Sequence, residues 1–268
     1  MTSYVPLSAV DLGIAALLVL LNGAISFAYS LRLEKSLAIA AVRMIVQLAA
    51  VAMVLRFIFQ SVNPWWSIAF AAVMALAASF EIITRQQYRF KAWMPMLLSA
   101  SPAFLAGLAT TLLALAVIQP APWYAPRFLL PILGMLTGNT LSGVSLVLDT
   151  LTASAMRERQ QIEARIALGA TRFEAFGDIL RRAMRTALMP VFNAMAAAGI
   201  VSLPGMMTGQ ILAGIDPMEA AKYQILIMFL IAGATAIAVL AAGLATVHFL
   251  TDDRHRLRLD YLQRGAKD

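Results

Sequence analysis

Four polar residues stand within apolar stretches of the sequence, and their side-chain oxygens could bind a cation. They are Glu81, Asn139, Asp149 and Asn193. Because a carboxylate or an amide is costly inside a bilayer, such residues are candidates for function when an apolar stretch crosses a membrane. Carboxylate and amide oxygens also suit hard and borderline divalent cations. The four residues therefore form a candidate cation path. The alternative is structural, with the two carboxylates at the membrane surface and Asn139 holding helices together.

A second unusual stretch, SLPGMMTGQILAGIDP at residues 202–217, places helix breakers where the chain is otherwise apolar. Proline lacks the amide hydrogen that a helix needs, and glycine weakens a helix. Broken helices at membrane depth are tolerated where protein or water satisfies the freed backbone groups, and in transporters they often form binding sites. The candidate gate residues are Pro204, Gly205, Met206, Met207, Gly209 and Asp216. The alternative is a kinked span followed by a re-entrant turn that only shapes the packing.

Residues that bind metals tightly are scarce in this sequence. It contains no cysteine, which excludes disulfides, zinc–thiolate sites and a cysteine nucleophile within these 268 residues. Its two histidines, His248 and His255, have no partner at a metal-binding spacing. No motif of a zinc protease or a serine hydrolase is present. We therefore expect a protein that is not an enzyme and that has no tightly bound cofactor.

The longest polar segment, residues 152–187, carries the pattern of two helices separated by a sharp turn. Gly169 suits the left-handed conformation that often ends a helix. Thr171 followed by Glu174 forms a capping box, which starts the next helix. An apolar stripe with arginines beside it then continues, as in helices that lie on a membrane surface. A short helix presented on such a turn can also dock into a groove of another protein. The residues alone leave both interpretations open.

The elements that would position these residues are membrane-spanning helices. The chain is 61% apolar and 13% charged, with a mean hydropathy of +0.78, whereas soluble domains are about half apolar and about a quarter charged. Seven apolar runs approach the ~20 residues that cross a bilayer. They cover residues 9–30, 37–59, 65–83, 95–118, 127–151, 188–212 and 222–250. The sequence thus predicts an all-α polytopic membrane protein with about seven spans in one domain over residues 1–268.

The distribution of lysine and arginine predicts the orientation of these spans. Of 21 such residues, 17 fall in four alternate loops. The loops are residues 31–36, 84–94, 152–187 and 251–268. Because cytoplasmic loops carry an excess of positive charge, we expect the N-terminus outside, the C-terminus inside, and segment 152–187 in the cytoplasm between spans five and six. Contact with the lipid bilayer explains the net charge of +7, and no nucleic-acid partner is expected. We expect a multi-pass protein of the inner (plasma) membrane.

The cytoplasmic segment resembles a known coupling motif. Residues 163–169 read EARIALG, which is similar to the motif of ABC-transporter permeases in which a short helix docks on the ATP-hydrolysing subunit. The matching residues are Glu163, Ala164, Arg165, Leu168 and Gly169, with Arg165 in the place of an alanine. The resemblance implies that these residues transmit ATP-driven movement to the spans.

Two further segments extend this resemblance to the FetB family of ABC-transporter permeases. GMLTGNTLSGVSL at 134–146 and SLPGMMTGQILAGIDPMEAAKYQI at 202–225 flank the coupling segment in the same order as in that family. FetB proteins are membrane subunits of an exporter associated with iron, and the family includes plant proteins linked to aluminium tolerance. The resemblance implies a permease that exports iron or another metal cation. It also implies a homodimer that works with a FetA-like ATP-binding subunit.

The energy source of such an exporter is not within this sequence. A phosphate-binding loop would read GxxxxGK[ST], and no Gly-Lys pair occurs in the chain. We therefore expect a partner chain to use the ATP. The alternative is an autonomous ion channel or ion-coupled carrier, in which segment 152–187 would only be an interfacial helix.

Overall fold

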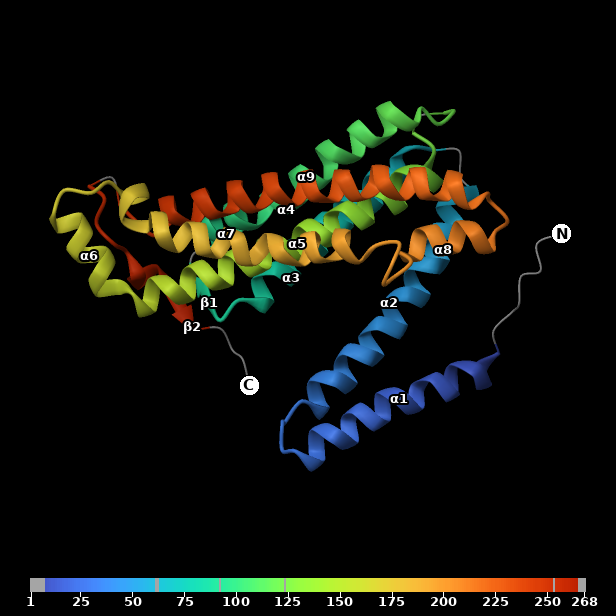
Figure 1. Ribbon diagram of the computed structural model, residues 1–268, viewed down its shortest axis with the longest axis horizontal. Helices are drawn as coiled ribbons and strands as arrows, with labels where there is room; N and C mark the ends of the chain where they lie inside the picture. Colours follow the sequence, from blue (N-terminus) through green and yellow to red (C-terminus); the bar gives the residue numbers. More distant parts are fainter. Residues whose placement is uncertain (1–7, 61–62, 92, 123, 253, 265–268) are drawn as a thin grey trace. The chain divides into compact units, whose positions relative to one another are not determined.

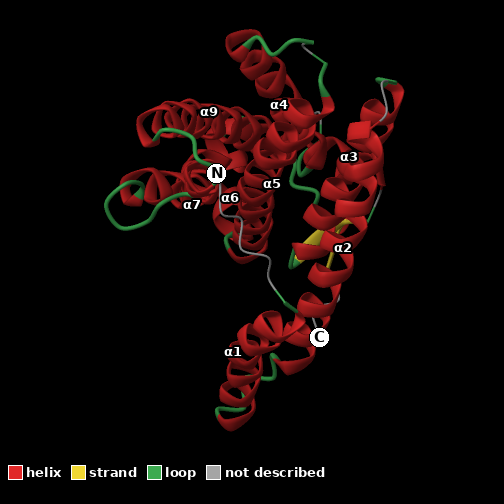
Figure 2. Cartoon of the chain, turned by 90° about the vertical axis from the view of Figure 1, so that its right-hand side faces the viewer, coloured by secondary structure: helices red, strands yellow, loops and turns green. Residues whose placement is uncertain are grey.

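The computed structural model describes residues 8–60, 63–91, 93–122, 124–252 and 254–264 (Figure 1). Helices make up nearly all of this part of the chain, with one short pair of strands (Figure 2). The helices are α1 (Ala9–Ala28), α2 (Glu34–Gln60), α3 (Trp65–Arg85), α4 (Trp93–Ile118), α5 (Pro126–Arg157), α6 (Arg159–Ala167), α7 (Arg172–Ala197), α8 (Gly205–Leu212) and α9 (Pro217–Phe249). The strands β1 (Tyr88–Phe90) and β2 (Leu262–Arg264) pair antiparallel, and the 3-10 helix η1 (Leu259–Tyr261) precedes β2.

The chain divides into two compact units, residues 1–63 with 212–215 and residues 64–211 with 216–268. The first unit is a hairpin of α1 and α2. Its turn is fixed by Ser26, whose Oγ donates to Glu34 Oε1 at 2.9 Å and accepts the Leu33 amide at 3.0 Å. Nearly all the large apolar side chains of both helices are exposed on the chain itself, which suits contact with lipid. The prediction of one domain over residues 1–268 stays a prediction.

In the second unit α5 packs against α3, α4, α7 and α9. Small residues lie at its closest contacts. A Cβ atom on Gly143 would lie 2.6 Å from Thr235 Cγ2 of α9. A Cβ atom on Gly107 of α4 would lie 2.8 Å from Thr137 Oγ1 of α5. Small residues are typical of helix contacts in membrane bundles because they let the backbones approach closely. Glycine therefore sets the spacing of α5 from two of its neighbours.

A two-stranded ribbon lies at the same end of this unit as α6 (Figure 1). Strand β1 follows α3, and β2 ends the described chain, with Tyr88 opposite Arg264. Two side chains of α5 hold the ribbon. Asp149 Oδ1 accepts the Gln87 amide at 2.6 Å, and Thr152 Oγ1 donates to the Tyr88 carbonyl at 3.3 Å. The all-α prediction thus holds for the bundle, and the ribbon is an addition that joins two of the basic loops.

Six helices among the described residues are long and apolar enough to cross a membrane: α1, α2, α3, α4, α5 and α9. The protein is therefore a multi-pass membrane protein, and these helices match six of the seven predicted spans. The predicted span 188–212 is wrong in its extent, because α7 is one helix over 172–197 and the chain breaks before α8. Helix α7 starts as a charged amphipathic helix and runs alongside α5 and α9 from the α6 end to the α8 end (Figure 1). The orientation in the membrane stays a prediction.

Candidate functional site

The predicted helix, break and helix in segment 152–187 is confirmed. Only Glu158 separates α5 from α6, and Gly169 ends α6 with φ +93°, the left-handed conformation. Thr171 then caps α7, because its Oγ1 accepts the Glu174 amide at 3.4 Å and its own amide donates to Glu174 Oε2 at 2.7 Å. The Thr171 hydroxyl and amide also hold the pKa of the Glu174 carboxyl below its usual value. Local sequence signals therefore fix the turn that presents α6.

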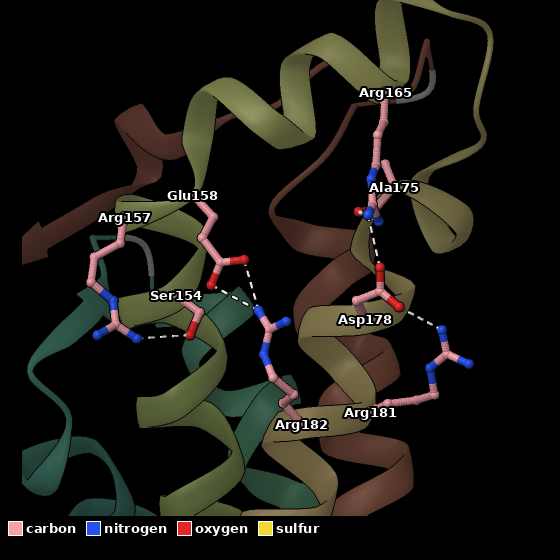
Figure 3. Close-up of polar contacts among 8 residues, drawn as sticks. All are labelled: Ser154, Arg157, Glu158, Arg165, Ala175, Asp178, Arg181 and Arg182. Atoms are coloured by element: carbon pink, nitrogen blue, oxygen red, sulfur yellow. Dashed lines mark hydrogen bonds and ion pairs between the residues drawn. The ribbon is translucent and has the colours of Figure 1, made fainter.

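Ion pairs orient α6 against α7 (Figure 3). The Arg165 guanidinium lies 2.8 Å from Asp178 Oδ2 and donates to the Ala175 carbonyl at 3.4 Å. Arg181 lies 2.6 Å from the other oxygen of Asp178. Hydrogen bonds from Arg165 and then Arg181 favour the ionised carboxylate and hold the pKa of Asp178 below its usual value. Arg165 therefore forms an ion pair with α7 from the position where the resembled motif has an alanine.

A second tie joins the start of α6 to α7. Arg182 Nη2 donates to both carboxylate oxygens of Glu158, at 2.8 and 2.7 Å (Figure 3). Between the two ties, Ile162 of α6 and Phe176 of α7 are buried in one apolar cluster. Because exposed ion pairs add little stability individually, the apolar contact holds α6 in place and the ion pairs set its direction. Helix α6 is therefore fixed to α7 by both apolar and charged contacts.

The outer face of α6 is accessible. Glu163 pairs with Arg159 one turn earlier at 2.8 Å, and both side chains are exposed, Arg159 more than Glu163. Ala164 and Gly169 are exposed, and Leu168 at the tip of the helix is 89% exposed. Of the five residues that resemble the coupling motif, Arg165 contacts α7, and all five are exposed enough for a partner to reach.

The start of α7 is also tied to the C-terminal part of the chain. Arg172 Nε donates to His255 Nδ1 at 3.1 Å, and Arg172 Nη1 lies 2.9 Å from His248 Nδ1 at the end of α9. The sequence showed no partner spacing for these histidines, because the residue that joins them lies far away in the chain. The contact connects α7 to the tail that carries β2.

A cavity of about 360 Å³ lies between α5, α7 and α9. Its polar lining comes from α5, from Asn139, Ser142, Ser145 and Asp149. These residues follow one another at spacings of three, three and four residues and so share one face of the helix. Helix α7 contributes Ala187, Pro190, Val191 and Ala194, and α9 contributes Met228 and Ile231. The cavity therefore has one polar wall and two mainly apolar walls.

The structure brings two of the four predicted path residues to this cavity. Asn139 and Asp149 line it, whereas Glu81 of α3 and Asn193 of α7 are not among its described lining residues. Sequence reasoning missed Ser142 and Ser145. Their helical spacing from Asn139 and Asp149 was the signal that could have found them.

The stretch predicted as a gate begins in a turn after α7. Gly199 has φ +89°, and its amide donates to the Ser202 carbonyl at 2.9 Å. Pro204 precedes α8, which contains Gly205, Met206, Met207 and Gly209. Met206 packs on a buried cluster that also touches Met228 of the cavity. The break is confirmed, and a gating role for it stays a prediction.

Asp216, at the end of this stretch, caps α9. Its Oδ1 accepts the amides of Met218 at 2.9 Å and Glu219 at 3.3 Å, and Pro217 occupies the first position of the helix. Proline is favoured there because the first turn has no use for its missing amide hydrogen. The structure thus gives Asp216 a helix-starting role.

Comparisons with known proteins support one family. The uncharacterised protein family UPF0014 matches residues 9–250. The chain is 32% identical over 254 residues to the "Probable iron export permease protein FetB" of Escherichia coli, covering 95% of this chain and 96% of FetB. It is 38% identical over 217 residues to the UPF0014 membrane protein slr1647 of Synechocystis, covering 80% of this chain and 82% of that protein. It is also 32% identical over 225 residues to the protein ALUMINUM SENSITIVE 3 of Arabidopsis thaliana, covering 83% and 80% of the two chains. No solved structure matches the chain.

The predicted resemblance to FetB is confirmed by this similarity over nearly the whole chain. Because the family match covers residues 9–250, the chain belongs to the UPF0014 family of membrane proteins.

Proposed function

We propose that this protein is the permease subunit of an ABC transporter that exports iron or another metal cation. The relative from Escherichia coli, whose name describes a probable iron export permease, matches nearly the whole chain. The chain has no Gly-Lys pair and hence no phosphate-binding loop, so a separate FetA-like subunit would hydrolyse ATP. Two copies of the permease would work with two copies of that subunit.

The observation that carries this proposal is the path from α6 to the cavity. Helix α6 offers Leu168 and the Glu163–Arg159 pair to the outside, while its inner face is tied to α7 through Arg165 and Asp178. Helix α7 in turn forms one wall of the cavity. Closure of the ATP-binding subunits would move α6, and α7 would then shift against α5 and α9. Such sliding of packed helices is a common way to open or close a site.

A pull-down experiment tests the partnership. The tagged chain is purified from its native host in mild detergent, and the proteins that come with it are identified by mass spectrometry. We expect a stoichiometric ATP-binding subunit with the native chain. Leu168→Glu should abolish its recovery, because the substitution places a charge at the exposed tip of α6.

The matched control is Ile200→Glu. Ile200 is also a highly exposed aliphatic residue, at 92%, but it follows the C-terminal end of α7, whereas α6 precedes the N-terminal end of that helix. The control should retain the ATP-binding subunit. If no such subunit is recovered with the native chain, and the purified chain alone conducts ions in liposomes, the protein is an autonomous channel or carrier and the proposal is refuted.

A further inference from the structure

The polar wall of the cavity presents oxygen lone pairs, and two of its hydrogen-bond donor groups already bond to backbone carbonyls of α5. Asn139 Nδ2 donates one of its two hydrogens to the Met135 carbonyl at 2.8 Å, and its amide oxygen is an acceptor. Ser142 Oγ donates to the Gly138 carbonyl at 3.1 Å, which leaves the lone pairs of the hydroxyl. Asp149 accepts one amide through Oδ1, and a carboxylate has about four acceptor positions. The Asp149 carboxylate, together with these lone pairs, favours a cation over an anion at this wall.

Of the described residues that line the cavity, Asp149 has the only ionisable side chain, and none is lysine or arginine. The fixed charge at the cavity is therefore negative.

The spacing of the oxygens decides how a cation would be held. Asn139 and Asp149 are ten positions apart, which corresponds to about 15 Å along a helix at ~1.5 Å per residue. Consecutive members of the row are about 4.5–6 Å apart along the axis. One ion therefore cannot bind all four side chains. It would bind one or two of them at a time and move from one turn of α5 to the next.

The volume indicates that water accompanies the ion. The cavity volume of about 360 Å³ is many times the ~30 Å³ that a water molecule takes in the liquid, so several waters fit beside an ion. A cation with most of its inner shell of water fits this space. The donor set also selects the class of ion, since soft cations prefer several sulfur ligands and Met228 is the one sulfur residue among the described lining residues.

We infer that this cavity binds the transported cation as a partly hydrated, oxygen-preferring divalent ion. Asp149, which lies nearest the α6 end of the row, captures the ion, and Ser145, Ser142 and Asn139 pass it along α5. The inference rests on the proposed function for the idea that the ion is cargo. The presence of the site itself can be tested on the isolated chain.

The test is a titration of Mn²⁺ into the purified full-length chain in detergent, followed by the loss of the free Mn²⁺ signal in electron paramagnetic resonance. We expect saturable binding that Mg²⁺ or Fe²⁺ displaces and Cu⁺ does not. Asp149→Asn should weaken binding at least about tenfold, because it removes the single full charge at the cavity. Asparagine can still accept the Gln87 amide, so the contact with the ribbon is preserved.

Two further variants make the result specific. Ser142→Leu fills the cavity without altering the carboxylate, and it should also weaken binding. Asp260→Asn removes an exposed carboxylate far from α5 in sequence, 3.5 Å from Arg258, and should bind Mn²⁺ as the native chain does. Gel filtration and thermal unfolding show that each variant is folded.

Binding that is unchanged in Asp149→Asn, or equally weakened in Asp260→Asn, would overturn the inference. So would an absence of saturable Mn²⁺ binding to the native chain. These failures leave the pull-down of an ATP-binding subunit untouched, whereas loss of the subunit with intact Mn²⁺ binding would refute the proposed function alone.

Discussion

The contact between α5 and α9 gives a prediction whose size can be worked out from the structure. Gly143 lines the cavity, and a Cβ atom at this position would lie 2.6 Å from Thr235 Cγ2 and 3.1 Å from Val239 Cγ2. We predict that Gly143→Ala destabilises the protein by forcing the two helices apart. Gly233→Ala on α9 is the matched control, because no atom lies within 4 Å of its Cβ position.

The two substitutions share one effect and differ in another. Replacing glycine by alanine within a helix stabilises it by about 0.5–1 kcal/mol, and both variants gain this. Only Gly143→Ala also overpacks a helix contact, at a cost of about 1–3 kcal/mol. The difference in unfolding free energy between the variants is therefore about 1–3 kcal/mol. At about 2–4 °C per kcal/mol for a chain of this size, their midpoints should differ by about 2–12 °C.

The assay is thermal unfolding in detergent, followed by tryptophan fluorescence. Adding Thr235→Ala to Gly143→Ala should restore most of the loss, because it removes the Cγ2 atom that the new methyl group meets. It also removes a buried hydroxyl for which the structure shows no hydrogen-bond partner. Equal midpoints for Gly143→Ala and Gly233→Ala would refute the close α5–α9 contact, and with it the geometry of the cavity.

Two further predictions concern the α6 end. The pKa of Asp178 is lowered by Arg165 and Arg181, so its stabilising effect should be complete above the unfolded value near ~3.9 and should be lost as the pH falls through the lower folded value. The difference in thermal unfolding midpoint between the native chain and Asp178→Asn should then be constant from about pH 5 to 7 and should disappear in stronger acid. A difference that already shrinks between pH 7 and 5 would contradict the stabilising role of the Asp178 carboxylate. Arg172→Ala should expose the tail to trypsin at Arg254 and Arg256, because Arg172 contacts both histidines, whereas Arg185→Ala on the same helix should be cleaved at the native rate. Equal cleavage of the two variants would contradict a holding role for Arg172.

The parts of the fold that depend on neighbouring residues could be predicted from the sequence. Gly169, Thr171 and Glu174 act within one turn of the chain, so their pattern identified the end of α6 and the start of α7. The sixth span was misplaced for the opposite reason. Hydropathy finds residues 188–212 because they are apolar, but the helix is defined by its cap at Thr171 and by the break near Gly199.

Contacts between distant segments could not be predicted. The ribbon pairs Tyr88 with Arg264, and Arg172 meets His255, yet no local pattern links these residues. The cavity is an intermediate case. Its carboxylate and amide stand out as polar residues in an apolar stretch, but only the packing of α7 and α9 on α5 shows that Asn139 and Asp149 share one space.

In the proposed function, ATP hydrolysis on a partner drives a cation through this chain. The most direct measurement is the uptake of radioactive iron(II) by inside-out membrane vesicles that contain the chain and its ATP-binding partner. We expect iron(II) uptake that requires ATP, that is lost with Leu168→Glu and that is retained with Ile200→Glu. Uptake that continues without ATP and is unaffected by Leu168→Glu would contradict the proposed ATP-driven transport.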